Sequence, residues 1–265
     1  MSHAPRRVVQ LHVGGVIASE LSCSFKVQSD LSPKPNTADI EIRNAAEATR
    51  AAWSASDAGV SVELRAGYAG ERLARVFSGQ LRDVNHKHDH GTWVTTISSG
   101  DGDQASAQAS AAFAAGSTLS AAYARVAQEM KVGLGQLGAS LGVKIPGTTI
   151  HGKSLDELAR VSKAYGLTPT IQDGELHVIE EGKALPGRYV DASTGMIGSP
   201  EIVTKRVKDK KQRQIQVTHL MTADIRPGYL LEVGGEGQWL IKSVTWQGDT
   251  HGADWYVVAL GVPLR

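Results

Sequence analysis

The stretch Leu21-Ser-Cys-Ser-Phe-Lys-Val27 places an apolar side chain at every second position. Successive side chains of an extended strand point to opposite faces, so this alternation predicts a strand with one buried and one solvated face. Cys23, the only cysteine in the sequence, lies on the apolar face. We therefore expect a packing residue rather than a catalytic thiol. A single cysteine also excludes an internal disulfide and a zinc site with several thiolates.

The same alternation continues on both sides of this stretch through the first hundred residues. About six segments share it, separated by turn residues such as Gly14-Gly15. One helix is predicted among them, because Asn44 and Glu47 have the spacing of a capping box, and it is expected to end near Trp53. Short strands with one apolar face each close most economically into a small barrel or sandwich, which we expect over residues 1–105.

The composition then changes to a stretch rich in Ala and Ser, residues 104–117, which is typical of a linker or a loosely packed helix. The apolar residues that follow have helical spacing. Ser117 or Thr118 is the expected cap of this helix, and Gly133 and Gly135 are expected to end it.

A second helix has stronger signals. Ser154 and Glu157 form a predicted capping box, and Gly166 stands where a left-handed residue would end the helix. Directly afterwards, Asp173-Gly174 lies between two short apolar stretches, the pattern of a two-residue β-hairpin. Together these elements predict a small α/β module over residues 106–185.

Strand patterns return over residues 186–265 and predict a second small barrel. Residues 90–100 and 251–261 resemble each other: both have a His-Gly turn, a Trp that begins a strand and a Gly that ends it. The chain either carries two copies of one barrel, or two unrelated hairpins share glycine turns and an edge tryptophan.

The composition excludes several classes of protein. The 265 residues include 28 Lys and Arg and 27 Asp and Glu, a formal net charge of +1, so the general positive field of a nucleic-acid-binding protein is absent. The longest apolar runs fall far short of the ~20 residues that cross a bilayer, so we expect no membrane insertion. No secretory signal precedes the first strand, and we expect synthesis and folding in the cytoplasm.

The stretch Gly147-Thr-Thr-Ile-His-Gly152-Lys153-Ser154 satisfies the pattern of a phosphate-binding loop. In such a loop backbone amides surround the phosphates, the Lys reaches the terminal phosphates and the Ser holds magnesium. A hairpin rather than a parallel βαβ unit is predicted after it, and Ser154 already has a predicted role as a helix cap. Both predictions argue against a phosphate-binding loop, so a nucleotide-binding enzyme is an alternative function and not the leading one.

Two further clusters are candidate sites. His86, His88 and His90 alternate along one predicted strand and its turn, so they either bind a metal such as zinc or nickel or are solvated at a polar hairpin tip. Six basic residues lie between two later strands, where they either form a solvated loop or contact an acidic partner surface or passing nucleic acid. They are Lys205, Arg206, Lys208, Lys210, Lys211 and Arg213.

Nucleophilic catalysis has no candidate residues. The sequence has no Gly-x-Ser-x-Gly elbow and no carboxylate pair suited to glycoside hydrolysis. We expect a protein that is not an enzyme and has no cofactor. A ligand-binding or cell-wall-binding β protein is a further alternative.

Several stretches, in this order along the chain, resemble one known family. They are residues 35–44, 62–68, 76–83, 93–102, 198–200, 225–229 and 248–255. On these stretches, which cover most of the chain, it resembles the phage tail baseplate hub proteins, a tail-tube-like hub family related to the hubs of contractile injection systems. None of the stretches is a catalytic signature.

The resemblance implies a mainly β fold with two small tail-tube-like β-barrels flanking the α/β module. It also implies a homotrimeric ring in the virion tail or baseplate, assembled in the host cytoplasm, whose six barrels continue a sixfold tail tube. The implied partners are a tail-tube or distal tail protein, a spike or tip protein and a tape measure protein, with DNA only in passage. The implied mechanism is symmetry matching around a lumen.

Overall fold

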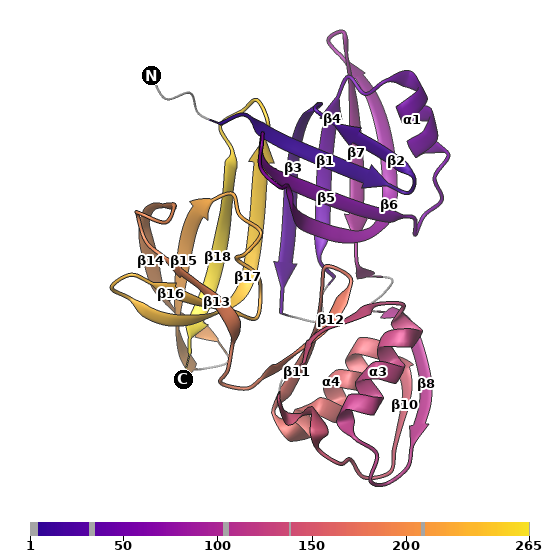
Figure 1. Cartoon of the computed structure of the whole chain (residues 1–265), viewed down its shortest axis with the longest axis vertical. Coiled ribbons are helices and arrows are strands. Elements are labelled where there is room, and N and C mark those ends of the chain that lie inside the picture. The colour runs from indigo at the N-terminus through magenta and orange to yellow at the C-terminus, as the bar shows by residue number, and fades with distance from the viewer. Residues whose placement is uncertain (1–4, 32–34, 103–105, 138, 208–209, 265) are drawn as a thin grey trace.

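The computed structural model describes residues 5–31, 35–102, 106–137, 139–207 and 210–264 (Figure 1). Strands dominate it, and a smaller α/β module occupies one end of the molecule. The expected mainly β fold with an α/β module between two β-rich segments is therefore confirmed. No helix among these residues is long and apolar enough to cross a membrane.

The first β-rich segment consists of strands in which buried and exposed residues alternate. Its elements are β1 (Arg7–Val13), β2 (Val16–Ser19), β3 (Ser22–Asp30), β4 (Thr37–Arg43), α1 (Glu47–Ser54), β5 (Ser61–Tyr68), β6 (Ala74–Asp89) and β7 (Thr92–Gly100). In β3 the predicted apolar face is confirmed, because Cys23, Phe25 and Val27 are buried. Burial raises the pKa of the Cys23 thiol to about 12, so it stays protonated at neutral pH.

Helix α1 buries Trp53 against this segment. The predicted capping box at Asn44 is wrong, because the helix begins after Ala46. Asn44 instead turns the chain with a φ of 55°, and its side-chain Oδ1 accepts a hydrogen bond from the backbone N of Trp93 at 3.2 Å. The side chain of Asn44 is thus hydrogen-bonded to β7 and does not cap the helix.

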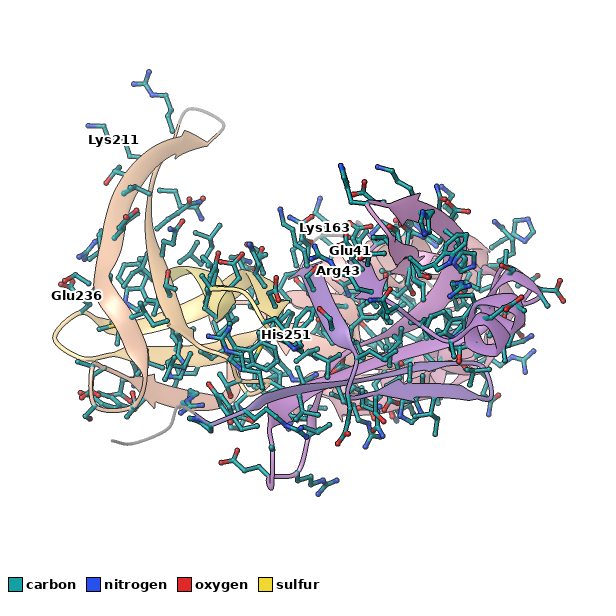
Figure 2. The ribbon with its side chains drawn as sticks, turned by 90° about the horizontal axis from the view of Figure 1, so that it is seen from above. Glu41, Arg43, Lys163, Lys211, Glu236 and His251 are labelled. Atoms are coloured by element: carbon teal, nitrogen blue, oxygen red, sulfur yellow. The ribbon has the colours of Figure 1, made fainter. Side chains whose placement is uncertain are left out.

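The second β-rich segment forms the other half of the large sheet. Its elements are β13 (Leu185–Val190), β14 (Met196–Val207), β15 (Lys210–Leu220), β16 (Tyr229–Val233), β17 (Gly237–Asp249) and β18 (Trp255–Pro263). Strands β14 and β15 form a hairpin that extends beyond the rest of the molecule, with Lys211 near its tip (Figure 2).

The two β-rich segments share one 13-stranded sheet. Its order is β14-β15-β18-β17-β3-β4-β7-β6-β5-β1-β2, with β16 on the first part of β17 and β13 on β16. Strand β17 pairs with β16 up to Leu240, and from Ser243 to Asp249 it pairs antiparallel with β3. Among the described residues these ladders form an open path with β14 and β2 at its ends, rather than two closed barrels.

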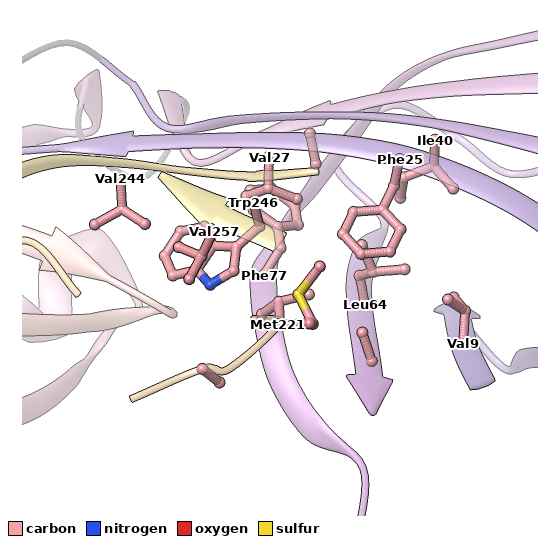
Figure 3. Close-up of a cluster of buried hydrophobic side chains, with 14 of the residues drawn as sticks. Val9, Phe25, Val27, Ile40, Leu64, Phe77, Met221, Val244, Trp246 and Val257 are labelled. Atoms are coloured by element: carbon pink, nitrogen blue, oxygen red, sulfur yellow. The ribbon is translucent and has the colours of Figure 1, made fainter. Parts of the chain in front are cut away.

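The core runs across the junction of the two segments. Val27 of β3, Trp246 of β17 and Val257 of β18 are cross-strand neighbours, so their side chains share one face of the sheet. Trp246 is 3% exposed, and its indole Nε1 donates to the carbonyl of Thr222 at 2.8 Å. Figure 3 shows this cluster with Met221 beside it. One hydrophobic core therefore supports both segments.

The α/β module has its own core, formed where α3 and α4 pack on two small sheets. Its elements are β8 (Gln108–Phe113), α3 (Leu119–Met130), β9 (Gly133–Leu137), η1 (Ala139–Gly142), β10 (Thr148–Lys153), α4 (Ser154–Ser162), η2 (Lys163–Tyr165), β11 (Leu167–Gln172) and β12 (Glu175–Glu180).

Several local predictions in this module need correction. The stretch expected as a linker or helix contains β8, because it pairs antiparallel with β10. Thr118 caps α3 as predicted, but the helix ends at Met130, followed by Lys131 as a left-handed cap with a φ of 56°, and Gly133 begins β9. Ser154 is the first residue of α4 and not its cap, because its buried Oγ donates to the carbonyl of Ala107 at 2.6 Å.

The β11–β12 hairpin joins the module to the large sheet. Its turn is confirmed, with positive φ angles at Asp173 (55°) and Gly174 (76°). At the junction, Ser29 Oγ donates to Gln172 Oε1 at 2.6 Å, and Gln172 Nε2 donates to the carbonyl of Asp30 at 3.2 Å. The end of β3 is therefore hydrogen-bonded to the end of β11.

Candidate partner interface

The β14–β15 hairpin carries the basic cluster that the sequence singled out. At its base Ile202 lies opposite Ile215 on the face that packs on the core. Two and four residues further along β14 the same face carries Thr204 and then Arg206. Since side chains alternate along a strand, the core-facing side of the hairpin becomes polar and then basic towards its tip.

The basic side chains at the tip are solvated. Arg206 lies opposite Lys211, and both are exposed. No carboxylate of the described residues forms an ion pair with either of them. Lys205 and Lys210 lie in β14 and β15, and Lys208 falls outside the described residues. A pair of free positive charges at the end of a long hairpin suits contact with an acidic surface.

Arg213 differs from the tip residues because it is held by the chain itself. Its guanidinium lies 3.5 Å from Glu236 Oε2 and 5.2 Å from the ring centroid of Trp239. An exposed ion pair contributes little, and the cation–π contact adds about 0.5–1 kcal/mol. Arg213 therefore contacts β17 and the turn before it, and it is less available to a partner than Arg206 and Lys211.

The two ends of the main strand path, β14 and β2, are further candidate contact surfaces. No other strand of the described chain pairs with the outer edges of β14 or β2. Val203 of β14 is 40% exposed and Ile17 of β2 is 58% exposed. An open edge with an exposed apolar side chain is the usual place for another chain to add a strand. The sequence did not reveal these edges, because strand order is not encoded in the periodicity.

The histidine cluster is divided among separate contacts. His86 Nε2 lies 2.8 Å from Ser54 Oγ, and its Nδ1 lies 2.9 Å from Thr95 Oγ1. The ring of His88 makes a T-shaped contact with the ring of Trp93, and His90 Nδ1 lies 2.8 Å from Asp89 Oδ1. Within the described ranges no group of three or more His, Cys, Asp and Glu side chains is placed to hold a metal ion.

The stretch with the phosphate-loop pattern has the geometry of a strand. β10 includes Gly152 and Lys153, which lie opposite Ala109 and Gln108 of β8. In a phosphate-binding loop consecutive amides point at one anion, whereas here the backbone of residues 148–153 follows an antiparallel ladder. Gly147 precedes the strand and Ser154 begins α4, with its hydroxyl directed at Ala107. The four candidate residues of the loop therefore do not surround a common phosphate position. They are Gly147, Gly152, Lys153 and Ser154.

One family model and several solved structures match this chain. The model of a family described as Baseplate hub gp41 matches residues 16–259. No curated protein matches the chain. The tail protein from Neisseria meningitidis MC58 is similar, with 14% identity, a TM-score of 0.69 and coverage of 97% of both chains.

Two other solved structures have the same fold. The 43 kDa tail protein of prophage MuSo2 from Shewanella oneidensis shares 14% identity with a TM-score of 0.66, over 97% of this chain and 98% of that one. The E. coli c3393 protein, a type VI secretion component, shares 11% identity with a TM-score of 0.63, over 96% of this chain and 77% of that one. At these identities the likeness shows the fold alone.

Proposed function

Because the chain belongs to the Baseplate hub gp41 family, we propose that it forms a trimeric, pseudo-sixfold ring joining the tail tube to the spike or tip of a virion. As a baseplate hub protein it is part of a phage tail or a related contractile injection system. In this proposal tape measure protein and then DNA pass through the lumen, and the chain assembles in the host cytoplasm without catalysing a reaction.

The observation that supports the ring most directly is the β3–β17 ladder. It sets the two β-rich segments of one chain side by side in a single sheet. Three chains would then present six such segments, the number that a sixfold tube requires, while keeping a threefold axis for the spike. We propose residues 1–105 and 186–265 as the two tube-like domains and residues 106–185 as the module between them.

The partners are inferred from chemistry and from similar proteins. The E. coli c3393 protein is described as structurally similar to the T4 bacteriophage tail proteins gp27 and gp5. By analogy we propose a tail-tube or distal tail protein on one side of the ring and a spike or tip protein on the other. The free charges of Arg206 and Lys211 suit an acidic surface on one of these neighbours.

A threefold ring has a further geometric requirement. Cyclic trimers use heterologous contacts, in which two different surfaces of each protomer meet. Two of the unpaired sheet ends in the described part of the chain, β14 with Val203 and β2 with Ile17, are two such surfaces. We propose that they, with the residues around them, form the contact between neighbouring subunits.

The first experiment is the native mass by light scattering over a concentration series, with negative-stain images of the same sample. We expect three times the chain mass of 28.1 kDa and a ring with a central hole. A monomer at every concentration would overturn the proposal of a self-assembling ring.

Two substitutions test the interface itself. Val203→Asp and Ile17→Asp each place a charge on one sheet end, so each variant alone should fail to form rings. In a mixture of the two variants, the intact β2 edge of Val203→Asp can pair with the intact β14 edge of Ile17→Asp. Only this one contact is possible, so the mixture should form dimers. Leu134→Asp, at a side chain that is also exposed but lies in the α/β module, should leave the wild-type mass unchanged. Wild-type mass in both edge variants would contradict the assignment of these edges.

A further inference from the structure

A cavity of about 760 Å³ lies between the two β-rich segments, on a part of the molecule that none of the candidate sites above includes. Its walls come from the β5–β6 turn, from β13 and from the loop before β16. Five arginines line it: Arg65, Arg72, Arg75, Arg188 and Arg226. Asp224 is the one acidic residue among its described lining residues.

Three of these arginines already hold a carboxylate of the same chain. Arg65 forms an ion pair with Glu63, and Arg226 forms one with Asp173 at the tip of the β11–β12 hairpin. Arg188 lies 3.3 Å from Asp224. Within the described part of the chain, Arg72 and Arg75 have no such partner. The cavity is therefore left with two guanidinium groups that no described carboxylate neutralises.

The positions of these charges are unfavourable in the chain by itself. Arg65 and Arg75 lie directly opposite each other in the β5–β6 ladder, and like charges at paired positions destabilise a sheet. Burial is the main cause that lowers the pKa of Arg226, and the positive charge of Arg75 acts in the same direction. Arg226 is fixed there, because its guanidinium donates to the carbonyl of Arg75 at 2.9 Å and to that of Ala223 at 2.7 Å. An anion between these groups would relieve the repulsion.

We propose that this cavity binds an acidic peptide segment of a partner protein, with its carboxylates on Arg72 and Arg75. The planar guanidinium fork matches a carboxylate in a bidentate geometry, and the ion pairs already present in the cavity show that its arginines take carboxylates. The volume is in the range of pockets that take ligands larger than a single ion. Only Tyr229 is aromatic among the described lining residues, so successive nucleic-acid bases would find no stacking platform.

The test measures binding to the full-length chain by isothermal titration calorimetry. The probe is an acetylated hexaglutamate peptide, with hexaglutamine, inorganic phosphate and a single-stranded DNA hexanucleotide as comparisons. We expect the hexaglutamate peptide to bind more tightly than the three comparisons, with an affinity that falls as salt is raised. The Arg72→Gln/Arg75→Gln double variant should lose at least about tenfold in affinity, since it removes two charge-assisted contacts.

The matched control is Lys131→Gln/Lys144→Gln, which removes the same charge from exposed positions of the α/β module and should leave the affinity unchanged. Arg72 and Arg75 hold no carboxylate of the described chain, so their replacement should not lower the melting temperature, which is measured alongside. Absence of hexaglutamate binding would overturn the proposal, and so would an equal loss in the control. Equal or tighter binding of phosphate or the oligonucleotide would assign the cavity to phosphate groups and also overturn it. None of these readouts depends on ring formation, so the ring proposal is tested separately.

Discussion

Asp101 lies directly after β7 and is 3% exposed. Its carboxylate accepts two hydrogen bonds from Asn36, one from the backbone N at 2.7 Å and one from Nδ2 at 2.6 Å. Asn36 Nδ2 also donates to the carbonyl of Ile171 at 3.0 Å, which connects this pair to β11. Burial raises the pKa of Asp101 to about 6, although the hydrogen bonds and the charge of Arg82 act against it. A group that titrates near neutrality therefore lies where the α/β module meets the sheet.

This pKa predicts a pH dependence of stability. The folded chain binds a proton at Asp101 near pH 6, whereas the unfolded chain binds it near the usual value of 3.8. The contribution of Asp101 to stability is therefore complete below about pH 4 and is lost as the pH rises through 6. A shift of about two units corresponds to about 3 kcal/mol.

The measurement is the melting temperature of the wild type and of Asp101→Asn between pH 5 and 7.5. We expect the difference between the two proteins to change with pH, in favour of the wild type at pH 5, because the asparagine cannot titrate. A difference that stays constant over this range would contradict the raised pKa.

At the scale of elements, the β11–β12 hairpin attaches the module to both β-rich segments. Gln172 bonds to β3, while the neighbouring Asp173 pairs with Arg226 in the loop before β16. Both contacts require a tight turn that aims these two side chains at the sheet. Gly174, with a φ of 76°, supplies the conformation that a residue with a Cβ adopts only at a cost.

Replacing this glycine should weaken the attachment. Gly174→Ala is expected to cost about 1–2 kcal/mol, since an L-residue is strained at positive φ. In a domain of this size each kcal/mol lowers the melting temperature by roughly 2–4 °C. Gly142→Ala is the matched control, because a Cβ there meets nothing within 4 Å and its φ is not in the left-handed region, so its melting temperature should not fall. Equal losses in both variants would contradict the argument.

The sequence predicted those elements whose signals are local. Alternation identified β3, and the Asp173-Gly174 pair identified the hairpin turn. β8 was not predicted, because residues such as Ala109 and Ala111 are too small to mark an apolar face. The strand is defined instead by its pairing with β10. Asn44 and Ser154 misled the capping analysis, because their side chains bond to distant segments, which a local pattern cannot reveal.

At the scale of the whole molecule, the junction between β3 and β17 is the feature that unites the chain. The core cluster includes residues of both segments, with Trp246 among strands of each. Periodicity could not predict this pairing, since it joins strands more than 200 residues apart in the sequence. The arginine cavity could not be predicted either. Arg65 and Arg226 are far apart in the sequence and line one cavity only in the folded chain.

Removing Trp246 should therefore affect both segments. Trp246→Ala is expected to cost about 3–5 kcal/mol, the usual range for a buried aromatic residue. Amide hydrogen exchange should rise in β4 as well as in β15, since one core supports both. Trp93→Ala, at a side chain that is 38% exposed, should cost about 1 kcal/mol at most and leave both strands protected. Increased exchange confined to β15 would mean that the segments unfold independently.

The β3–β17 ladder also has a consequence for synthesis on the ribosome. Strand β3 is complete at Asp30, but its partner begins to pair only at Ser243. At usual rates of translation this interval lasts roughly 10–40 s. During that time one edge of β3 lacks its neighbour and is open to other nascent chains. Protection of this edge by a chaperone should therefore determine how much of the protein is recovered in the native state.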